Sequence, residues 1–249
     1  MMKPLIYFSF GMTKTASTLA YHLAHIALED TGMAQPQIPP PAVAADRKIN
    51  FVTHLDERHI DQLWTLAQSL GHPLLVKTHT RPDPAVIAMI KDGRAIGSAA
   101  YRDPRDMALS MLDHGIKARR MGVQPFSEMV TLEDALHGIR GQVNDLAQWL
   151  RLPNILPLDF EDIAFDTKKT AARILNHLGI NGSPAALSTK AKDCFTQFNK
   201  GISARHVAEM SAKDSSRIAR EFAPLIAFLN HPHGPLPANT PLRYLDNTL

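Results

Sequence analysis

The sequence predicts a three-layer α/β domain with a mostly parallel central sheet. Short apolar runs alternate along the chain with longer segments in which apolar residues recur every three or four positions, as expected for strands followed by helices. Three of the runs end in polar or charged residues. With 249 residues, 45% of them hydrophobic, the chain is long enough to bury one substantial core. In sheets of this kind, ligands bind at the carboxyl ends of the strands.

The first strand and the turn after it form the most informative stretch. Residues 5–8 are a short apolar run, and a turn at Gly11 leads to Lys14-Thr15-Ala16-Ser17-Thr18, where helical periodicity begins. A helix start presents free N–H groups and the positive end of its dipole, and Lys14 adds a full charge. The stretch therefore predicts a phosphate-binding turn.

This turn is not a complete P-loop. That motif requires G-x-x-x-x-G-K-[ST], and Lys14-Thr15 matches its end, but Met12-Thr13 stand where the second glycine belongs. On this stretch alone, an ordinary strand, turn and helix without a ligand remains the alternative.

Further strands and helices follow in alternation. We expect strands at residues 73–76, 95–101 and 155–160, and helices at residues 56–70, 83–91, 132–150 and 167–178. Pro84 suits the first position of one helix, and Gly179 suits the end of another. Residues 184–230 are predicted to be helical, with a break at residues 199–201.

Another helix is predicted directly after Arg102. Asp103 is a suitable N-cap, Pro104 follows at the first helical position, and Asp106 at the third gives an arrangement like a capping box. The helix continues with apolar residues on one face: Met107, Met111, Leu112 and Ile116.

Two proline-rich segments are predicted to lack helix and strand. Residues 35–45 should form a surface excursion, either an inert loop or a flap over a pocket. The tail at residues 231–249 is also proline-rich. Because we find no internal repeat and no domain boundary, we expect residues 1–249 to form a single domain.

Composition excludes several classes of function. A net charge of +3 suits a small anionic ligand and is too low for a nucleic-acid-binding protein. Cys194 is the single cysteine, which excludes an internal disulfide and favours a reducing compartment. No apolar run is long enough to span a membrane, and the N-terminus lacks the pattern of a signal peptide, so we expect a cytoplasmic protein. The histidines show no metal-binding spacing, so no metal is expected.

The polar strand ends predict two anion-binding seats. Lys14, with the hydroxyls of Ser17 and Thr18, makes the first seat. Arg102 and Ser110 make the second, with Ser110 about 10 Å along its helix from the start. Two separated seats suggest a nucleotide that carries phosphates at both ends of its ribose.

Catalytic groups are predicted beside the first seat. A neutral imidazole at His79 is a suitable general base for a hydroxyl, although a structural histidine is the alternative. Lys77, two residues earlier on the same side of the strand, would stabilise negative charge where His79 removes a proton.

Five motifs, in order, resemble those of the sulfotransferases that use 3′-phosphoadenosine 5′-phosphosulfate (PAPS). Residues 13–19 resemble P-K-S-G-T-T-W, and residues 77–81 resemble K-T-H-L-P. Residues 102–110 resemble R-N-P-[KR]-D-x-x-x-S, and residues 160–162 resemble Y-E-D. Residues 199–206 resemble R-K-G-x-x-G-D-W-[KR] more weakly. The resemblance spans residues 5–230 and implies a P-loop-NTPase-like sulfotransferase architecture.

The resemblance also implies a role for each matching residue. The 5′-phosphosulfate would be bound by the first motif: Lys14, Thr15, Ala16, Ser17 and Thr18. The 3′-phosphate would be bound by Arg102 and Ser110, with Lys200 and Gly201 closing over it. Lys14 and Lys77 would stabilise the transferring group, and His79 would deprotonate the hydroxyl of a small-molecule acceptor. The reaction would be an in-line displacement at sulfur that requires no metal.

Departures from the family pattern carry further expectations. Ala16 replaces a glycine, so the loop must avoid positive φ there or be strained. Leu19 replaces the aromatic residue that packs on adenine, and Phe195 or Phe198 would supply that face. Asn199 replaces an arginine on the 3′-phosphate.

Weaker nucleotide binding is expected from these departures, by about 1.5–3 kcal/mol for one lost charged hydrogen bond. Arg205 is a candidate to replace the missing charge. Two alternatives stay open: a P-loop-type nucleotide phosphotransferase (kinase) that uses ATP and Mg²⁺, and a non-catalytic homologue that binds the nucleotide without turnover.

Overall fold

Five parallel strands form the centre of the protein. The computed structural model describes residues 5–44, 49–194 and 201–230. The strands are β1 (Ile6–Gly11), β2 (Phe51–Val52), β3 (Leu74–Thr78), β4 (Ala95–Tyr101) and β5 (Ile155–Asp159), in the spatial order β2-β3-β1-β4-β5. Every neighbouring pair is parallel. The predicted mostly parallel sheet is therefore confirmed.

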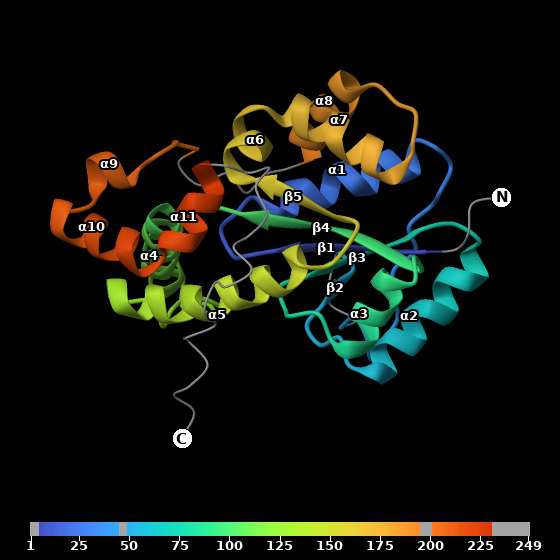
Figure 1. Ribbon diagram of the computed structural model, residues 1–249, viewed down its shortest axis with the longest axis horizontal. Coiled ribbons are helices and arrows are strands. Elements are labelled where there is room, and N and C mark those ends of the chain that lie inside the picture. The colour runs from blue at the N-terminus through green and yellow to red at the C-terminus, as the bar shows by residue number, and fades with distance from the viewer. Residues whose placement is uncertain (1–4, 45–48, 195–200, 231–249) are drawn as a thin grey trace.

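Helices cover both faces of this sheet, which confirms the three-layer arrangement (Figure 1). On one face lie α1 (Ser17–Glu29), α6 (Phe160–Phe165), α7 (Thr167–Leu178) and α8 (Pro184–Cys194). On the other face lie α2 (Glu57–Leu70), α3 (Pro84–Lys91), α4 (Pro104–Met121), α5 (Leu132–Leu150), α10 (Ala212–Glu221) and α11 (Ala223–Asn230). The short helix α9 (His206–Glu209) precedes α10.

Alternating side chains of β1 divide the core between the two faces. Ile6, Phe8 and Phe10 pack with the cluster under α2, α3 and α5, whereas Tyr7 packs with α1 and α7. All four are buried. Because β1 is covered on both faces, its sequence is almost continuously apolar, as expected for a central parallel strand.

The register brings three polar strand ends to one edge. Ser9 of β1 lies opposite Lys77 on β3 and Ser98 on β4, and Gly11 lies opposite Ala100. The chain therefore leaves β1, β3 and β4 at neighbouring positions, which is where a ligand binds in an open parallel sheet.

The predicted helices begin and end close to their expected residues because their capping residues act as local signals. Asp56 and Asp83 accept hydrogen bonds from N–H groups in the first turns of α2 and α3. Gly179 ends α7 at φ 65°. Two short elements were not predicted: β2, which has only two residues, and α6, which follows β5 without a loop.

The helix α4 differs from expectation in two ways. Asp103 caps it as predicted, but Asp106 does not complete a capping box, because its carboxylate accepts hydrogen bonds from His206 instead. Ile116 was expected on the buried face and is 45% exposed. Ile116 comes more than two turns after Met107, and over that length the predicted apolar face rotates away from the core.

The proline-rich segment lacks helix and strand through residue 44, as predicted, but it is more than a surface excursion. Ile38, Ala42 and Val43 are buried in the main core. Asn50 and Gln62 hold this segment through its backbone, since Asn50 accepts from Ile38 N and Gln62 donates to the carbonyl of Pro39. The proline-rich tail lies outside the described residues.

Candidate active site

The loop between β1 and α1 folds back closely on itself. A Cβ at Gly11 would lie 2.4 Å from the Cβ of Ser17, so only glycine permits this approach. Thr15 is buried and its hydroxyl donates to the carbonyl of Met12 at 2.6 Å. These contacts hold the start of α1 directly over the end of β1.

Two residues of this loop adopt left-handed conformations. Lys14 has φ 64° and Ala16 has φ 57°. The expectation that Ala16 either avoids positive φ or is strained is resolved in favour of strain. The turn keeps the backbone that a glycine would take there, at a cost of about 1–2 kcal/mol for a residue with a Cβ.

The first turn of α1 presents unsatisfied backbone donors. Its N-cap residue is Ala16, which has no side chain that can accept a hydrogen bond. Within the described part of the chain, the N–H groups of Ser17 and Thr18 have no acceptor. Together with the helix dipole, these donors are suited to bind an anion.

Lys77, Ser17 and His79 meet beside this loop. The ammonium nitrogen of Lys77 donates to Ser17 Oγ at 3.4 Å and lies 2.9 Å from His79 Nε2. Lys77 is 2% exposed, and no carboxylate in residues 5–44, 49–194 or 201–230 forms an ion pair with it. Burial lowers the pKa of Lys77 to about 7.

The tautomer of His79 follows from its two partners. Nδ1 makes a short hydrogen bond to the carbonyl of Gly11, which only accepts, so Nδ1 carries the proton. Nε2 therefore presents a lone pair, to which Lys77 donates. Burial, and then the neighbouring charge of Lys77, lower the pKa of His79 to about 3. The imidazole is neutral near pH 7.

Lys14 lies apart from this group. Its ammonium nitrogen is 5.1 Å from the centre of the Phe126 ring. Burial, and then the neighbouring charge of Arg102, lower the pKa of Lys14 to about 8. The structure thus places Lys14 in the loop as predicted, but its side chain does not join Lys77 and His79.

Arg102 connects the end of β4 to the same loop. Its guanidinium donates to the Lys14 carbonyl at 3.2 Å and stacks on Phe160, with 3.6 Å between Cζ and the ring centre. Its Nε is buried and has no hydrogen-bond partner in the described residues. Ser110 is buried two turns along α4. Arg102 and Ser110 are both buried but are not bonded to each other, so the second anion seat stays a prediction.

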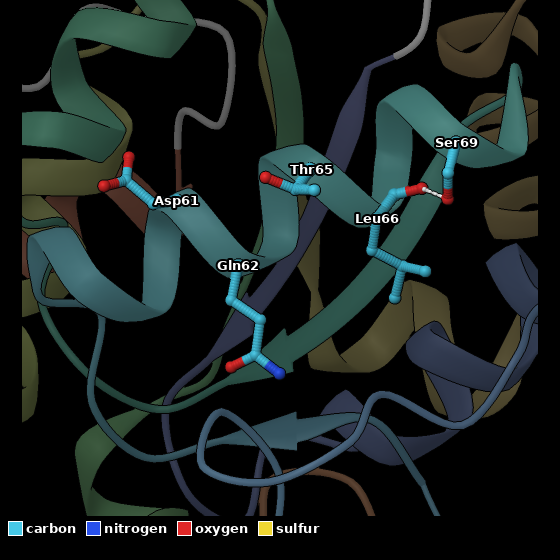
Figure 2. A pocket seen from close by; sticks show the side chains of 5 residues that line it. All are labelled: Asp61, Gln62, Thr65, Leu66 and Ser69. Atoms are coloured by element: carbon cyan, nitrogen blue, oxygen red, sulfur yellow. Dashed lines mark hydrogen bonds between the residues drawn. The ribbon is translucent and has the colours of Figure 1, made fainter.

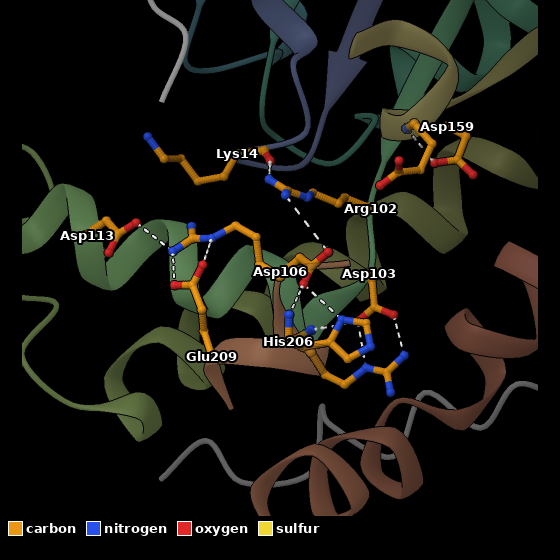
Figure 3. Close-up of polar contacts among 11 residues, drawn as sticks. Lys14, Arg102, Asp103, Asp106, Asp113, Asp159, His206 and Glu209 are labelled. Atoms are coloured by element: carbon orange, nitrogen blue, oxygen red, sulfur yellow. Dashed lines mark hydrogen bonds and ion pairs between the residues drawn. The ribbon is translucent and has the colours of Figure 1, made fainter. Parts of the chain in front are cut away.

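Asp106, in the first turn of α4, lies between these two residues in the sequence, and its charge is compensated. The carboxylate accepts from the backbone N–H of His206 at 2.8 Å and lies 2.9 Å from His206 Nδ1. Arg102 Nη2 is 3.9 Å from the other carboxylate oxygen. Figure 3 shows these contacts converging from β4, α4 and α9.

Arg205 does not act as a free replacement for the arginine missing at residue 199. Its guanidinium forms ion pairs with Asp113 at 2.8 Å and Glu209 at 2.6 Å, and the residue is 3% exposed (Figure 3). Arg205 therefore fastens the segment around α9 to α4. Asn199 itself lies outside the described residues.

Several site residues were not identified from sequence. Gln142 accepts hydrogen bonds from Thr13 N at 2.5 Å and Thr13 Oγ1 at 2.9 Å. The Phe51 ring lies 5.2 Å from both the His79 ring and the Lys77 nitrogen. These contacts join residues far apart in the chain, and nothing in their local sequence marks them.

The remaining residues expected to contact the nucleotide have different outcomes. Gly201 is exposed with φ 59°, whereas Lys200, Phe195 and Phe198 lie outside the described residues. Leu19 is fully buried in the core under α1 and offers no face to a ligand.

A separate pocket lies on α2. It has a volume of about 430 Å³ and is lined by one face of that helix: Asp61, Gln62, Thr65, Leu66 and Ser69 (Figure 2). None of the residues at the strand ends lines it.

The described ranges contain neither a metal-binding cluster nor a membrane-spanning helix. No group of three His, Cys, Asp or Glu side chains there is arranged to hold a metal ion. No helix among the same residues has the length and apolar character needed to cross a membrane.

Comparisons with known proteins agree with this geometry. The model of the sulfotransferase domain family matches residues 11–223. A search of curated proteins by sequence finds no significant match. Retinol dehydratase in complex with retinol and 3′-phosphoadenosine 5′-phosphate (PAP) is similar in structure, with a TM-score of 0.55 and 16% identity over 88% of this chain and 80% of that one. Mouse sulfotransferase SULT7A1 complexed with PAP has a TM-score of 0.56 and 14% identity over 88% and 83% of the two chains.

Proposed function

Because this chain belongs to the sulfotransferase domain family, we propose that it transfers a sulfuryl group from PAPS to a hydroxyl of a small-molecule acceptor. The observation that carries the proposal is the buried cation of Lys77, which forms no ion pair among the described residues, beside a neutral His79. A buried charge without a partner is costly, so such a site is built to receive an anion. A hydroxyl nucleophile needs a base beside that anion, and His79 Nε2 offers a lone pair there.

The residues present fit the nucleotide donor at both ends. At the 5′ end, the free N–H groups of Ser17 and Thr18 and the charge of Lys77 favour an anion. At the 3′ end, Arg102 has an Nε that makes no hydrogen bond among the described residues, and the buried Ser110 on α4 carries a hydroxyl. The neighbouring carboxylate of Asp106 does not repel a phosphate strongly, because it is already paired with His206 and Arg102. When bound, the donor supplies an activated sulfuryl group.

The chain's own residues would then act in a simple order. Lys77 turns from His79 toward the anion, which frees the Nε2 lone pair to accept the proton of the acceptor hydroxyl. Negative charge beside these groups raises the pKa of both, so His79 holds that proton better than it does alone. Lys77, Ser17 and the N–H groups of α1 stabilise the charge that develops on oxygen.

Ligand-induced stabilisation tests the nucleotide part of the proposal. We expect PAP to raise the midpoint of thermal unfolding, by the equivalent of about 2.7 kcal/mol at 100 times its dissociation constant. Removal of the 3′-phosphate, as in 5′-AMP or ADP, should abolish most of this effect. If ATP with Mg²⁺ stabilises instead, the phosphotransferase alternative replaces the proposal. If no nucleotide stabilises the protein, the proposal fails.

His79→Asn tests the base. The Asn amide can still donate to the Gly11 carbonyl, as Nδ1 does, but it offers no basic nitrogen at the Nε2 position. We expect kcat to fall by about 10²–10⁴-fold, while the stabilisation by PAP is retained. Unchanged kcat would exclude His79 as the base. Binding of PAP without any turnover by the wild-type protein would favour the non-catalytic homologue.

A further inference from the structure

The helix α5 is hydrogen-bonded on both sides of His79. Gln142 accepts from Thr13, which lies two residues after Gly11, the residue whose carbonyl holds the imidazole. Trp149 Nε1 donates to the carbonyl of Thr80, the residue after His79, at 2.9 Å. One face of α5 therefore forms a wall beside the base.

Asp145 occupies the turn of α5 between these two contacts. It comes three residues after Gln142 and four before Trp149, and residues at those spacings lie on the same side of a helix. Along the axis it is about 4.5 Å from one and about 6 Å from the other. Its carboxylate is thus carried by the wall that adjoins His79.

The carboxylate of Asp145 is half-buried. Within the described ranges, neither a hydrogen bond nor an ion pair satisfies Asp145. Burial raises the pKa of Asp145 to about 6, and the more distant charge of Arg81 offsets this only in part. By contrast, Asp103, Asp106 and Asp113 are each paired with an arginine or a histidine.

We infer that Asp145 binds the acceptor and selects hydroxyl compounds that also carry a protonated amine. The inference rests on the proposed function. An ammonium group would give the carboxylate the charge-assisted hydrogen bonds that the described residues do not provide. The carboxylate takes no part in the transfer itself, so Asp145 is a specificity-determining residue.

Two phenols that differ by one amine test this inference. Tyramine and 4-ethylphenol present the same hydroxyl on the same ring with a two-carbon arm, and only tyramine ends in an ammonium group. For the wild-type protein we expect kcat/KM to favour tyramine by roughly 10- to 100-fold. Asp145→Asn keeps the shape of the side chain and should abolish this preference through a higher KM for tyramine, with 4-ethylphenol unaffected.

A matched control separates a local from a general charge effect. Asp61→Asn removes the same charge from the exposed face of α2 and should leave the preference intact. If neither phenol is turned over, the preference is measured as the ratio of the two dissociation constants for the PAP-loaded protein. Equal affinities for the two phenols, an unchanged ratio in Asp145→Asn, or no binding of tyramine would each overturn the inference.

A different result would contradict the proposed function. Absence of any stabilisation by PAP would contradict the nucleotide site, whatever the phenols do. Stabilisation by PAP in both the wild-type and the Asp145→Asn protein, without a preference for the amine, would contradict only the role of Asp145.

Discussion

Two cationic groups, the buried Lys77 and the half-buried Lys14, link stability to ligand binding at the scale of individual residues. Lys77 and Lys14 both have pKa values lowered chiefly by burial, to about 7 and about 8. The folded protein holds these charges at a cost to stability, and a bound anion would recover that cost. Stability and ligand binding are therefore coupled at these two side chains.

Substitution of Lys77 by methionine should make this coupling visible. The pKa of Lys77 is about 7 in the folded protein and 10.5 in its ordinary state, so between these values the unfolded chain holds a proton that the folded chain has released. Stability contributed by this residue therefore rises with pH across that window. The free energy of unfolding of Lys77→Met should therefore exceed that of the wild type by at least about 1–2 kcal/mol at pH 7.

The difference should narrow as the pH rises toward 10.5, because the unfolded chain then begins to release the proton that the folded chain has already lost. Denaturant unfolding of both proteins from pH 6 to pH 10 measures it. A difference that stays constant across this range would show that Lys77 titrates normally. The variant should also lose transfer activity, since it lacks the cation beside His79.

Backbone strain at Ala16 is a second property of a single residue. With φ 57°, this position favours glycine. Ala16→Gly should raise the free energy of unfolding by about 0.5–1 kcal/mol, less than the full left-handed penalty because glycine also has more freedom in the unfolded chain. The same change inside α1, Ala20→Gly, should destabilise the protein by about 1 kcal/mol. Destabilisation by both would mean that the loop is not strained.

At the scale of elements, the success of sequence interpretation depended on local signals. Asp83 before Pro84 and Asp103 before Pro104 mark helix starts by chemistry that involves only neighbouring residues, and both were identified correctly. The two residues of β2 carry no periodicity, so they could not be found. Asp106 was misread because its true partner, His206, lies 100 residues away.

The long-range contacts of the site escaped prediction for the same reason. Gln142 is one of several polar residues on an amphipathic helix, and only the packing of α5 brings it to Thr13. Phe126 is an unremarkable loop residue until the loop folds over Lys14. The polar strand ends were predictable because a parallel sheet places them at one edge wherever the intervening helices pack.

Close packing between α4 and the loop that follows it gives a prediction for an element. A Cβ at Gly115 would lie 2.4 Å from the Met129 carbonyl oxygen and 2.8 Å from that of Phe126, and both obstacles are backbone. Gly115→Ala should therefore push the loop away from α4 and destabilise the protein by about 1–3 kcal/mol. The Phe126 ring would then leave Lys14.

Gly141→Ala is the matched control, because nothing lies within 4 Å of the added Cβ there. This second variant should gain about 0.5–1 kcal/mol from better helix propensity. Equal stability changes in the two variants would show that the loop does not rest on Gly115. Thermal or denaturant unfolding distinguishes these outcomes.

At the scale of the whole molecule, residues 201–230 close the side of the protein where α4 begins. Two buried contacts hold this segment, from His206 to Asp106 and from Arg205 to Asp113. Further along, α11 packs its Phe228 ring 5.0 Å from that of Tyr101 at the end of β4. The segment therefore attaches directly to the residues around Arg102, and we expect its attachment to support the second anion seat.

Arg205→Met should detach this segment without unfolding the rest. The change removes the charge that pairs with Asp113 and Glu209 while keeping a long apolar stem. Because Asp113 and Glu209 each lose one ion pair, we expect a loss of about 1–3 kcal/mol in stability. Hydrogen–deuterium exchange should rise in α9 and α10, whereas β1, β3 and α1 remain protected.

Arg217→Met provides the comparison, since Arg217 forms ion pairs with Glu133 and Asp214 at a 40% exposed position on α10. Exposed pairs contribute little, so this variant should change neither stability nor exchange appreciably. If Arg205→Met weakens stabilisation by PAP and Arg217→Met does not, the attachment of α9 to α4 supports the nucleotide site. Faster exchange throughout the sheet would instead mean that Arg205 stabilises the whole fold, and undiminished protection of α9 would mean that the apolar contacts of α11 suffice to hold the segment.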